Sequence, residues 1–329
     1  MNGMLRLLRR AFALVASVIL AACGSAAGGA DTVVPPPLSQ RGMVRGDAAL
    51  IVTLLGTGDP TPRIDRFGPS TLVEAGDKAL LFDIGRGAMQ RLYQIGHSSA
   101  KLDAIFLTHL HSDHVVGLVD LWLTGWVIDR RKSPLRIYGP PGTAEMVKHL
   151  GAAFTFDIDI RTSEARLDPQ GVRLEVVEME DGFVWSEGDV TVRAFLVDHS
   201  PVEPAFGFRV DRDTHAVALS GDTRYSEALI RHARGVDLLL HEVAEASEER
   251  KAERPLLPRL AHHTQAADAG RVFTAVRPKL AVFTHLVLVD GFDPAGLIPL
   301  ARSTWDGPLV VGEDLMTFRI GAEVAIEKR

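Results

Sequence analysis

Three histidines and an aspartate lie close together in the segment 106–114, which reads Phe-Leu-Thr-His-Leu-His-Ser-Asp-His. His109 and His111 are two positions apart, so on an extended or tightly turned backbone both imidazoles lie on the same side and can reach one ion. Asp113 and His114 point elsewhere. Imidazole nitrogen together with some carboxylate oxygen is the donor set that zinc and similar cations favour. The two divergent pairs therefore predict a site for two metal ions.

Three more side chains that could bind metal come at the ends of short apolar runs. His199 ends a run of alternating apolar and polar residues, Asp222 lies in a Ser-Gly-Asp-Thr turn after 216–220, and His285 follows 280–284. Strands fix ligand geometry, and the loops that follow them leave space for a substrate. A carboxylate has two oxygens and can hold two cations, whereas an imidazole seldom does. Asp222 is thus the candidate for a bridging ligand.

The elements that must position these side chains alternate between strand and helix patterns. Apolar runs predict strands at 50–55, 70–75, 78–83, 104–108, 135–138, 216–220, 238–241 and 280–284. Helical spacing predicts helices over 85–95, 115–127 and 143–150, and the alternation between 172 and 210 indicates antiparallel strands. Mixed strands and helices over this length predict an α/β protein in which two sheets pack face to face with helices outside.

The order of the polar residues resembles one enzyme family. A His-x-His-x-Asp-His segment, a later single histidine, a Gly-Asp-Thr aspartate and a final histidine after a strand resemble the metallo-β-lactamase superfamily, and within it the ribonuclease Z and arylsulfatase-like branch. The runs 55–58, 81–87 and 239–242 support the resemblance, which extends from about residue 54 to residue 285. It implies an αββα sandwich of two mixed β-sheets with helices on the outer faces, and a hydrolase that uses two divalent ions.

The resemblance also implies which residues bind each ion. The first ion, most simply Zn²⁺ with Mn²⁺ or iron as alternatives, takes the first three histidines, the second takes Asp113 and two histidines, and one aspartate bridges them. The implied ligands are His109, His111 and His199 for the first ion, Asp113, His114 and His285 for the second, and Asp222 between the two.

Two residues are expected to handle protons. Asp113 would orient the attacking water or accept its proton. A histidine at the start of the helical run 266–270 would contact the substrate oxyanion or protonate the leaving group, and the spacing favours His263 over His262 for this role. His241 and Glu242 lie on a strand that is aimed at the same edge, where they could orient a ligand or His263, although packing in the core explains them equally well. A serine triad is the rival mechanism, and the absence of a Gly-x-Ser-x-Gly turn argues against it.

The first residues of the chain predict export. Arg6, Arg9 and Arg10 precede the uncharged apolar run 11–22, which is too short to span a bilayer comfortably and ends in a bacterial lipobox pattern at Cys23. Cys23 is the single cysteine, so no intramolecular disulfide or thiolate metal site can form.

The sequence thus divides into a signal peptide over 1–22 with Cys23 lipidated, a Gly/Pro-rich tether over 23–47 and a hydrolase domain over 48–329. This places the protein on the periplasmic side of a bacterial membrane, held by the lipid on Cys23, or secreted or periplasmic if Cys23 is not modified.

The charge balance argues against nucleic acid as a partner. The chain has 36 Lys and Arg against 42 Asp and Glu, a formal net charge of −6, and cleavage after residue 22 would remove three basic residues and no acidic ones. The segment 150–197, where a ribonuclease Z carries a basic arm, is acidic: Asp157, Asp159, Glu164, Glu175, Glu178, Glu180 and Asp181. We therefore expect an exported hydrolase for a small phosphodiester or related ester. The alternatives are an arylsulfatase-like sulfate ester hydrolase, a ribonuclease Z-type endonuclease and a non-catalytic metal-binding exported protein.

Overall fold

The computed structural model describes residues 48–251 and 260–328. The predicted signal peptide, the lipidated Cys23 and the tether over 23–47 lie outside these residues, so export stays a prediction. In the part of the chain that is described, none of the helices is both long enough and apolar enough to cross a membrane.

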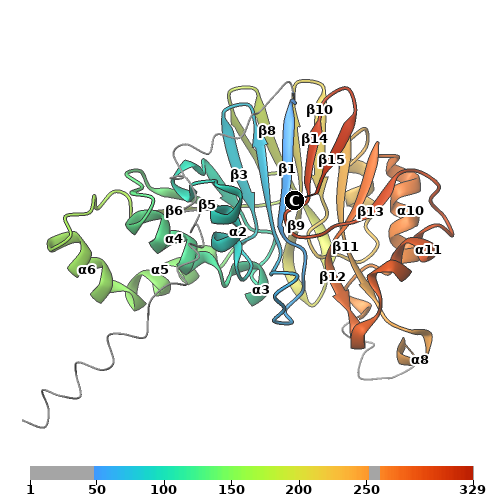
Figure 1. Ribbon diagram of the computed structural model, residues 1–329, viewed down its shortest axis with the longest axis horizontal. Helices are drawn as coiled ribbons and strands as arrows, with labels where there is room; N and C mark the ends of the chain where they lie inside the picture. The colour runs from blue at the N-terminus through green and yellow to red at the C-terminus, as the bar shows by residue number, and fades with distance from the viewer. Residues whose placement is uncertain (1–47, 252–259, 329) are drawn as a thin grey trace, which may run out of the picture. The chain divides into compact units, whose positions relative to one another are not determined.

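Two mixed sheets form the centre of the described domain (Figure 1). One sheet has the strand order β15 (Val324–Glu327), β14 (Thr317–Ile320), β1 (Leu50–Gly56), β2 (Ser70–Ala75), β3 (Lys78–Phe82), β4 (Ala104–Phe106), β5 (Leu135–Gly139) and β6 (Leu174–Glu178). The other has the order β13 (Leu309–Val311), β12 (Leu280–Leu288), β11 (Leu238–Glu245), β10 (His215–Leu219), β9 (Val202–Arg212), β8 (Val190–His199) and β7 (Val184–Glu187). In each sheet a run of parallel strands, β3 to β6 or β10 to β13, adjoins antiparallel strands.

The main core lies between the two sheets. Alternate residues of the strands face inward, so Phe106 of β4 meets side chains of its own sheet and of the other. Its ring centroid lies 5.2 Å from that of Phe82, 5.1 Å from Tyr138 and 5.7 Å from Phe208 of β9. This packing holds the segment that follows β4, which carries His109, against a rigid support.

Helices cover the two outer faces. On the first sheet, α2 (Ala88–Ile95), α4 (Leu118–Val127) and α5 (Thr143–Ala153) pack over a second apolar cluster. On the other, α7 (Glu227–His232), α10 (Ala266–Val276) and α11 (Leu297–Ala301) do the same. The predicted αββα sandwich is confirmed. The other helices among the described residues are α3 (Ser112–Val115), α6 (Thr155–Ser163), α8 (Glu248–Lys251) and the 3-10 turns η2 (Ser99–Lys101), η4 (Val289–Gly291) and η5 (Pro294–Gly296). Of these, α6 projects to the left of the sandwich in Figure 1.

Element ends differ from the sequence predictions in two places near the candidate site. The strand predicted over 104–108 ends at Phe106, because the Thr108 amide donates to the Asp83 carboxylate instead of to a neighbouring strand. The helix predicted over 115–127 is two helices, and α3 begins at Ser112. Asp113 and His114 are therefore helical, which turns them away from the extended residues His109 to His111.

A buried carboxylate ties parallel strands of the second sheet together. Asp237, directly before β11, is 4% exposed, accepts a hydrogen bond from the Ala216 amide at 2.9 Å and lies 2.7 Å from Lys279 Nζ. Burial raises the pKa of the Asp237 carboxyl, but the hydrogen bonds from Lys279 and Ala216 outweigh it and hold the pKa below its ordinary value.

The variant Asp237→Asn is expected to lower the free energy of unfolding by about 1–3 kcal/mol at neutral pH, because a buried acceptor of charge-assisted bonds is lost. A carboxyl with a depressed pKa stabilises the fold above its unfolded pKa, so the difference from wild type should shrink below about pH 4. Urea titrations at pH 7 and pH 3.5 measure both effects. An unchanged difference at the two values would contradict the assignment.

Candidate metal centre

The carboxyl ends of parallel strands from both sheets meet at one edge of the sandwich, and the predicted ligands gather there. His109 and His111 follow β4, and His199 is the last residue of β8. Asp222 lies in the loop after β10, and His285 is in β12. Clefts at such strand ends are where open α/β sheets bind ligands.

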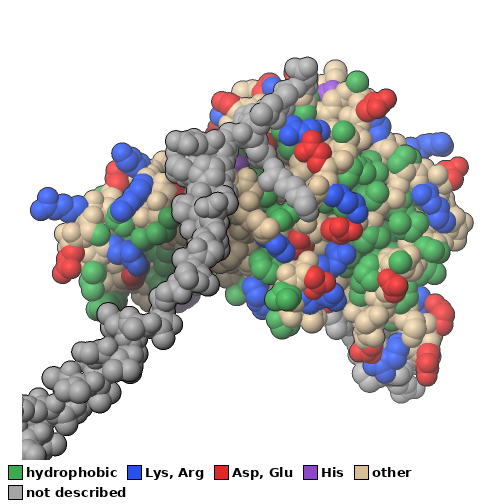
Figure 2. Space-filling model, viewed as in Figure 1, with side chains coloured by type: hydrophobic (Ala, Val, Ile, Leu, Met, Phe, Trp, Pro, Cys, Tyr) green, Lys and Arg blue, Asp and Glu red, His purple; other side chains and the backbone are tan. Residues whose placement is uncertain are grey.

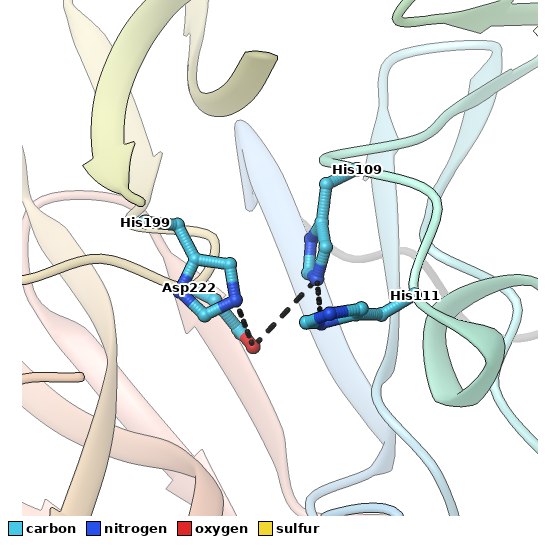
Figure 3. A group of neighbouring side chains, drawn as sticks. All are labelled: His109, His111, His199 and Asp222. Atoms are coloured by element: carbon cyan, nitrogen blue, oxygen red, sulfur yellow. Dashed lines mark hydrogen bonds and ion pairs between the residues drawn. The ribbon is translucent and has the colours of Figure 1, made fainter. Parts of the chain in front are cut away.

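Four of these side chains form a first group, drawn in Figure 3. His109 Nε2 lies 3.0 Å from His111 Nδ1 and 3.9 Å from Asp222 Oδ2, and His199 Nε2 lies 3.8 Å from the same oxygen. Potential ligand atoms of all four lie within 4.8 Å of one another. A single cation could therefore contact three imidazoles and one carboxylate.

Asp113, His114 and His285 form a second group, also within 4.8 Å. His285 Nε2 lies 3.2 Å from His114 Nε2 and 3.3 Å from Asp113 Oδ2. Asp222 Oδ2 lies 3.4 Å from His114 Nε2 and 3.5 Å from His285 Nε2, so this oxygen faces both groups. The structure thus brings all seven predicted ligand side chains together, with Asp222 between the two sets.

A β-bulge aims His285 at the cluster. In the pairing of β11 with β12, Glu242 is opposite Thr284 and Val243 is opposite Leu286, which leaves His285 as the extra residue. Its φ is 43°, a conformation that residues with a Cβ rarely adopt. The bulge turns the imidazole out of the regular alternation and towards Asp113, as bulges near active sites commonly do.

The buried polar atoms of the cluster fit metal ions. Within the described residues, His199 Nε2 and Asp222 Oδ1 are buried and have no hydrogen-bond partner. Buried polar atoms are normally paired, so each exception needs an explanation. Five imidazoles and two carboxylates with converging lone pairs are the donor set of a site for divalent cations.

Burial and neighbouring charges shift the pKa values of several side chains in the cluster. Burial raises the pKa of the Asp222 carboxyl, but the charges on His285 and His114 outweigh it and hold the pKa well below its usual range. Burial lowers the pKa of His114, yet the carboxylates of Asp222 and Asp83 outweigh it and raise the pKa well above its ordinary value. Burial, followed by the charge on His114, holds the pKa of His109 well below its ordinary value. Protons and cations therefore compete for the same nitrogens.

Asp83 and Thr108 support the ligands, although neither was predicted from the sequence to belong to the site. Asp83 Oδ2 lies 2.8 Å from His114 Nδ1, and Asp83 accepts hydrogen bonds from the amide and hydroxyl of Thr108. The Thr108 hydroxyl lies 3.0 Å from His109 Nδ1. Partners of this kind fix the orientation of a ligating imidazole. The signal for Asp83 was an acidic residue at the end of an apolar run, 78–83.

The variant Asp83→Asn is expected to weaken metal binding about 10–100-fold, since an amide orients His114 less firmly than a carboxylate. Titration with Zn²⁺ against a chromophoric chelator measures the change. Asp77→Asn changes an exposed aspartate near the other end of β3 and should bind metal as wild type does. Equal affinities in Asp83→Asn and wild type would remove Asp83 from the site.

His263 lies beside the second group and is held by Glu242. Its Nδ1 is 3.3 Å from Glu242 Oε2, and its ring is 5.8 Å from that of His285. The other oxygen of Glu242 accepts hydrogen bonds from the backbone amides of Thr223 and Thr264. These bonds join the loop that carries Asp222 to the loop that carries His263. Burial lowers the pKa of His263, but the Glu242 carboxylate outweighs it and raises the pKa to about 9.

The neighbouring His262 is placed differently. Its backbone carbonyl accepts a hydrogen bond from His199 Nδ1 at 2.8 Å, which orients that predicted ligand. Burial, followed by the charge on His263, lowers the pKa of its side chain to about 4. At neutral pH the His262 imidazole is therefore uncharged, whereas the His263 imidazole is protonated on both nitrogens and carries a positive charge.

His241 and Glu242 face opposite sides of β11, because successive residues of a strand alternate. Glu242 points to the cluster as described, while the His241 ring packs 5.7 Å from the Phe273 ring of α10. His241 Nδ1 donates a hydrogen bond to the backbone carbonyl of Glu242. The structure thus brings Glu242 to the site and places His241 in the outer core.

Comparison with known proteins identifies the family. A model of the beta-lactamase superfamily domain matches residues 79–286. The chain belongs to the metallo-β-lactamase superfamily and is a hydrolase of that fold. A protein named ribonuclease Z from Mycobacterium bovis (strain BCG / Pasteur 1173P2) is 38% identical over 270 residues, 81% of this chain and 96% of the relative. Another from Mycobacterium marinum (strain ATCC BAA-535 / M) is 36% identical over 276 residues, 82% of this chain and 99% of the relative.

Solved structures of this superfamily share the fold. The metallo-β-lactamase fold protein YhfI from Bacillus subtilis superposes with a TM-score of 0.64 at 20% identity and covers 82% of this chain and 98% of its own. The short form of human tRNase Z gives a TM-score of 0.61 at 22% identity, with 82% and 99% covered.

The similarity to these relatives contradicts the partner that was predicted from the sequence. The prediction of a small-molecule ester as substrate, with nucleic acid argued against, is wrong, because the relatives named ribonuclease Z match this chain over nearly their whole length. Net charge averages over the whole surface, while binding depends on the local field. On the face shown in Figure 2, basic and acidic side chains of the described domain are interspersed. Bound divalent ions would in addition be the largest local charges at such a site.

Proposed function

We propose that this protein is a metal-dependent ribonuclease that hydrolyses phosphodiester bonds of RNA. The observation that carries the proposal is the 36–39% identity to proteins named ribonuclease Z over 94–99% of their length. The geometry of the cluster agrees with it, because two adjacent cation sites that share one carboxylate are typical of enzymes that cut phosphodiesters. RNA thus replaces the small ester that the charge balance favoured.

The proposal assigns the two groups to two divalent ions, most simply Zn²⁺. His109, His111 and His199 would hold the first, Asp113, His114 and His285 the second, and Asp222 both. When bound, the ions supply a nucleophilic water of lowered pKa and neutralise charge on the phosphate.

Asp113 would accept a hydrogen bond from the attacking water and so fix its orientation. Its carboxyl lies at the start of α3, 3.3 Å from His285 Nε2. Burial raises its pKa, but His285 and His114 outweigh it and lower the pKa, which keeps Asp113 an acceptor at neutral pH.

His263 would protonate the leaving oxygen. Hydrolysis adds the water oxygen to phosphorus, breaks the bond to the departing ribose oxygen and leaves that oxygen needing a proton. The Glu242 carboxylate faces Nδ1, so the proton at Nε2 is the one available to the substrate. A positioned imidazolium in such a role contributes about 10²–10⁴-fold in rate.

Cleavage assays on the full chain test the proposal. A precursor transfer RNA transcript, an unstructured RNA and a DNA strand of matched sequence are each incubated with metal-loaded protein. We expect RNA to be cut and cleavage to stop on addition of EDTA. A metal-loaded protein that leaves every RNA intact yet hydrolyses a bis-aryl phosphodiester would refute it.

We also retain the proposal that the protein is exported and anchored through Cys23. The apolar run 11–22 and the lipobox pattern support it. Expression of the full chain in a bacterium with labelled palmitate should give a labelled membrane protein, and Cys23→Ser should abolish the label. An unlabelled protein in the cytosolic fraction would refute it.

A further inference from the structure

A buried aspartate near the C-terminus holds the loop between β1 and β2. Asp314 has a side chain that is 4% exposed, and each of its two oxygens accepts two hydrogen bonds. Oδ1 accepts hydrogen bonds from the amide and hydroxyl of Thr57, at 2.9 and 2.8 Å. Oδ2 accepts from the Phe67 amide at 2.8 Å and from Arg91 at 2.9 Å. One carboxylate therefore closes the base of the loop 57–67.

Both sheets fix Asp314 in turn. The Gly312 amide donates to the Phe283 carbonyl of β12, at 2.7 Å. The Leu315 amide donates to the Leu54 carbonyl of β1, at 2.6 Å. Asp314 lies between these two anchor points, so its position is set by a strand of each sheet.

The two ends of the loop that Asp314 closes lie next to the backbone of two second-group residues, His285 and Asp113. The Thr57 carbonyl accepts a hydrogen bond from the amide of Leu286, the residue directly after His285, at 2.9 Å. On the other side, Gly68 and Gly85 pack so tightly on the Asp113 carbonyl oxygen that an added Cβ would lie 3.2 or 2.7 Å from it. The loop thus adjoins the backbone at His285 through Thr57, and the backbone at Asp113 through Gly68, the residue that follows the loop.

The first group is supported by different residues. His199 is oriented by the His262 carbonyl, and Arg224 links its loop to the next by donating to Asp198 and to the Ala261 carbonyl. None of the contacts of Asp314 described above involves these residues. A change at Asp314 should therefore act on one group and spare the other.

We propose that Asp314 is a positioning residue for the second metal ion, which acts through the loop 57–67 on Asp113 and His285. The inference rests on the proposed metal centre but not on RNA as the substrate. An amide at position 314 cannot accept at both ends, so Asp314→Asn loses the bonds from Thr57 or those from Phe67 and Arg91. The ligands of the second ion then lose their common support.

Metal titration of the full chain tests this. Wild type and Asp314→Asn are freed of metal and titrated with Zn²⁺ against a chromophoric chelator, to give two stepwise dissociation constants. We expect one of the two dissociation constants to rise at least about tenfold, as for other partners of metal ligands, and the other to stay within about twofold. With Co²⁺, the visible absorption of one bound ion should shift while that of the other is kept.

Asp237→Asn is the matched control. It also removes a buried carboxylate that accepts a backbone amide and a cationic side chain, at a place away from the cluster. It should keep both Zn²⁺ constants. If Asp314→Asn keeps them as well, or weakens both ions equally, the inference is overturned.

A milder variant covers the case in which Asp314→Asn fails to fold. Thr57→Val removes only the hydroxyl that bonds Asp314 and Arg66, in a fully buried side chain of nearly the same shape. It should weaken the second ion in the same direction by a smaller factor. The RNA assay is separate: a protein that binds two ions and cuts no RNA would refute the proposed function and leave this inference standing.

Discussion

Replacing Asp222 by alanine is expected to lower kcat/KM for RNA cleavage by about a thousandfold or more, equivalent to about 4 kcal/mol of transition-state stabilisation. The reason is its position between the two groups. Asp222 Oδ2 lies 3.4–3.9 Å from His109, His114, His199 and His285, so one carboxylate balances the charge of both proposed ion sites. Its loss should also reduce bound Zn²⁺ below two equivalents per chain.

Steady-state cleavage of RNA and elemental analysis of the dialysed protein measure these effects. Asp120→Ala is the control, because it removes an α4 carboxylate that accepts hydrogen bonds from Gln90 and Thr124 and has no contact with the cluster described above. It should keep both rate and metal content. Normal metal content and a rate within about tenfold of wild type in Asp222→Ala would show that the two groups do not share this ligand.

Replacing His263 by alanine is expected to lower kcat for RNA by about 10²–10⁴-fold without loss of metal. The proposed role is protonation of the departing ribose oxygen, which is a poor leaving group. A substrate with a p-nitrophenolate leaving group needs no such proton, so its hydrolysis should fall far less. Comparison of the two substrates separates proton donation from a general loss of structure.

The pH profile gives a second sign of this role. The Glu242 carboxylate raises the pKa of His263 to about 9, so the imidazolium is present below that value and is lost as the pH rises through it. Wild-type activity should therefore decline on the alkaline side, and bound cations would move the decline to lower pH. His263→Ala should lack this alkaline limb.

His262→Ala is the matched control for His263→Ala. The pKa of His262 is lowered to about 4, so its side chain is neutral at pH 7 and cannot act as the acid, while its backbone carbonyl remains to orient His199. Its rate for RNA should stay within about tenfold of wild type. The opposite ranking of the two variants would assign the acid to His262.

Much of the architecture could be predicted from local patterns. The runs 70–75 and 78–83 are separated by Gly76 and Asp77, a pattern that predicts two strands joined by a turn. In the structure β2 and β3 form this hairpin, with Ala75 opposite Lys78. The C-terminal strands β13 to β15 were not predicted. They are short. The pairing of β14 with β1 and of β13 with β12 joins segments that are far apart in the sequence, so no local pattern reveals it.

The substrate could not be predicted from composition. A count of 36 basic and 42 acidic residues treats the surface as uniform. It favoured a small ester as the substrate, whereas the relatives are named ribonuclease Z. Attraction to a phosphate is decided within a Debye length of about 10 Å, so a few local charges outweigh the total.

The sequence alone determined the candidate ligands. His109, His111, Asp113 and His114 are close in the chain, so their spacing reveals them, and the order of His199, Asp222 and His285 resembles one family. Only the tertiary structure decided what supports them: Asp83 against His114, Glu242 but not His241 at the site, and Asp314 under the loop 57–67. The physical reason is that a strand or helix fixes spacing along one segment, whereas hydrogen bonds between distant segments depend on how the sheets pack.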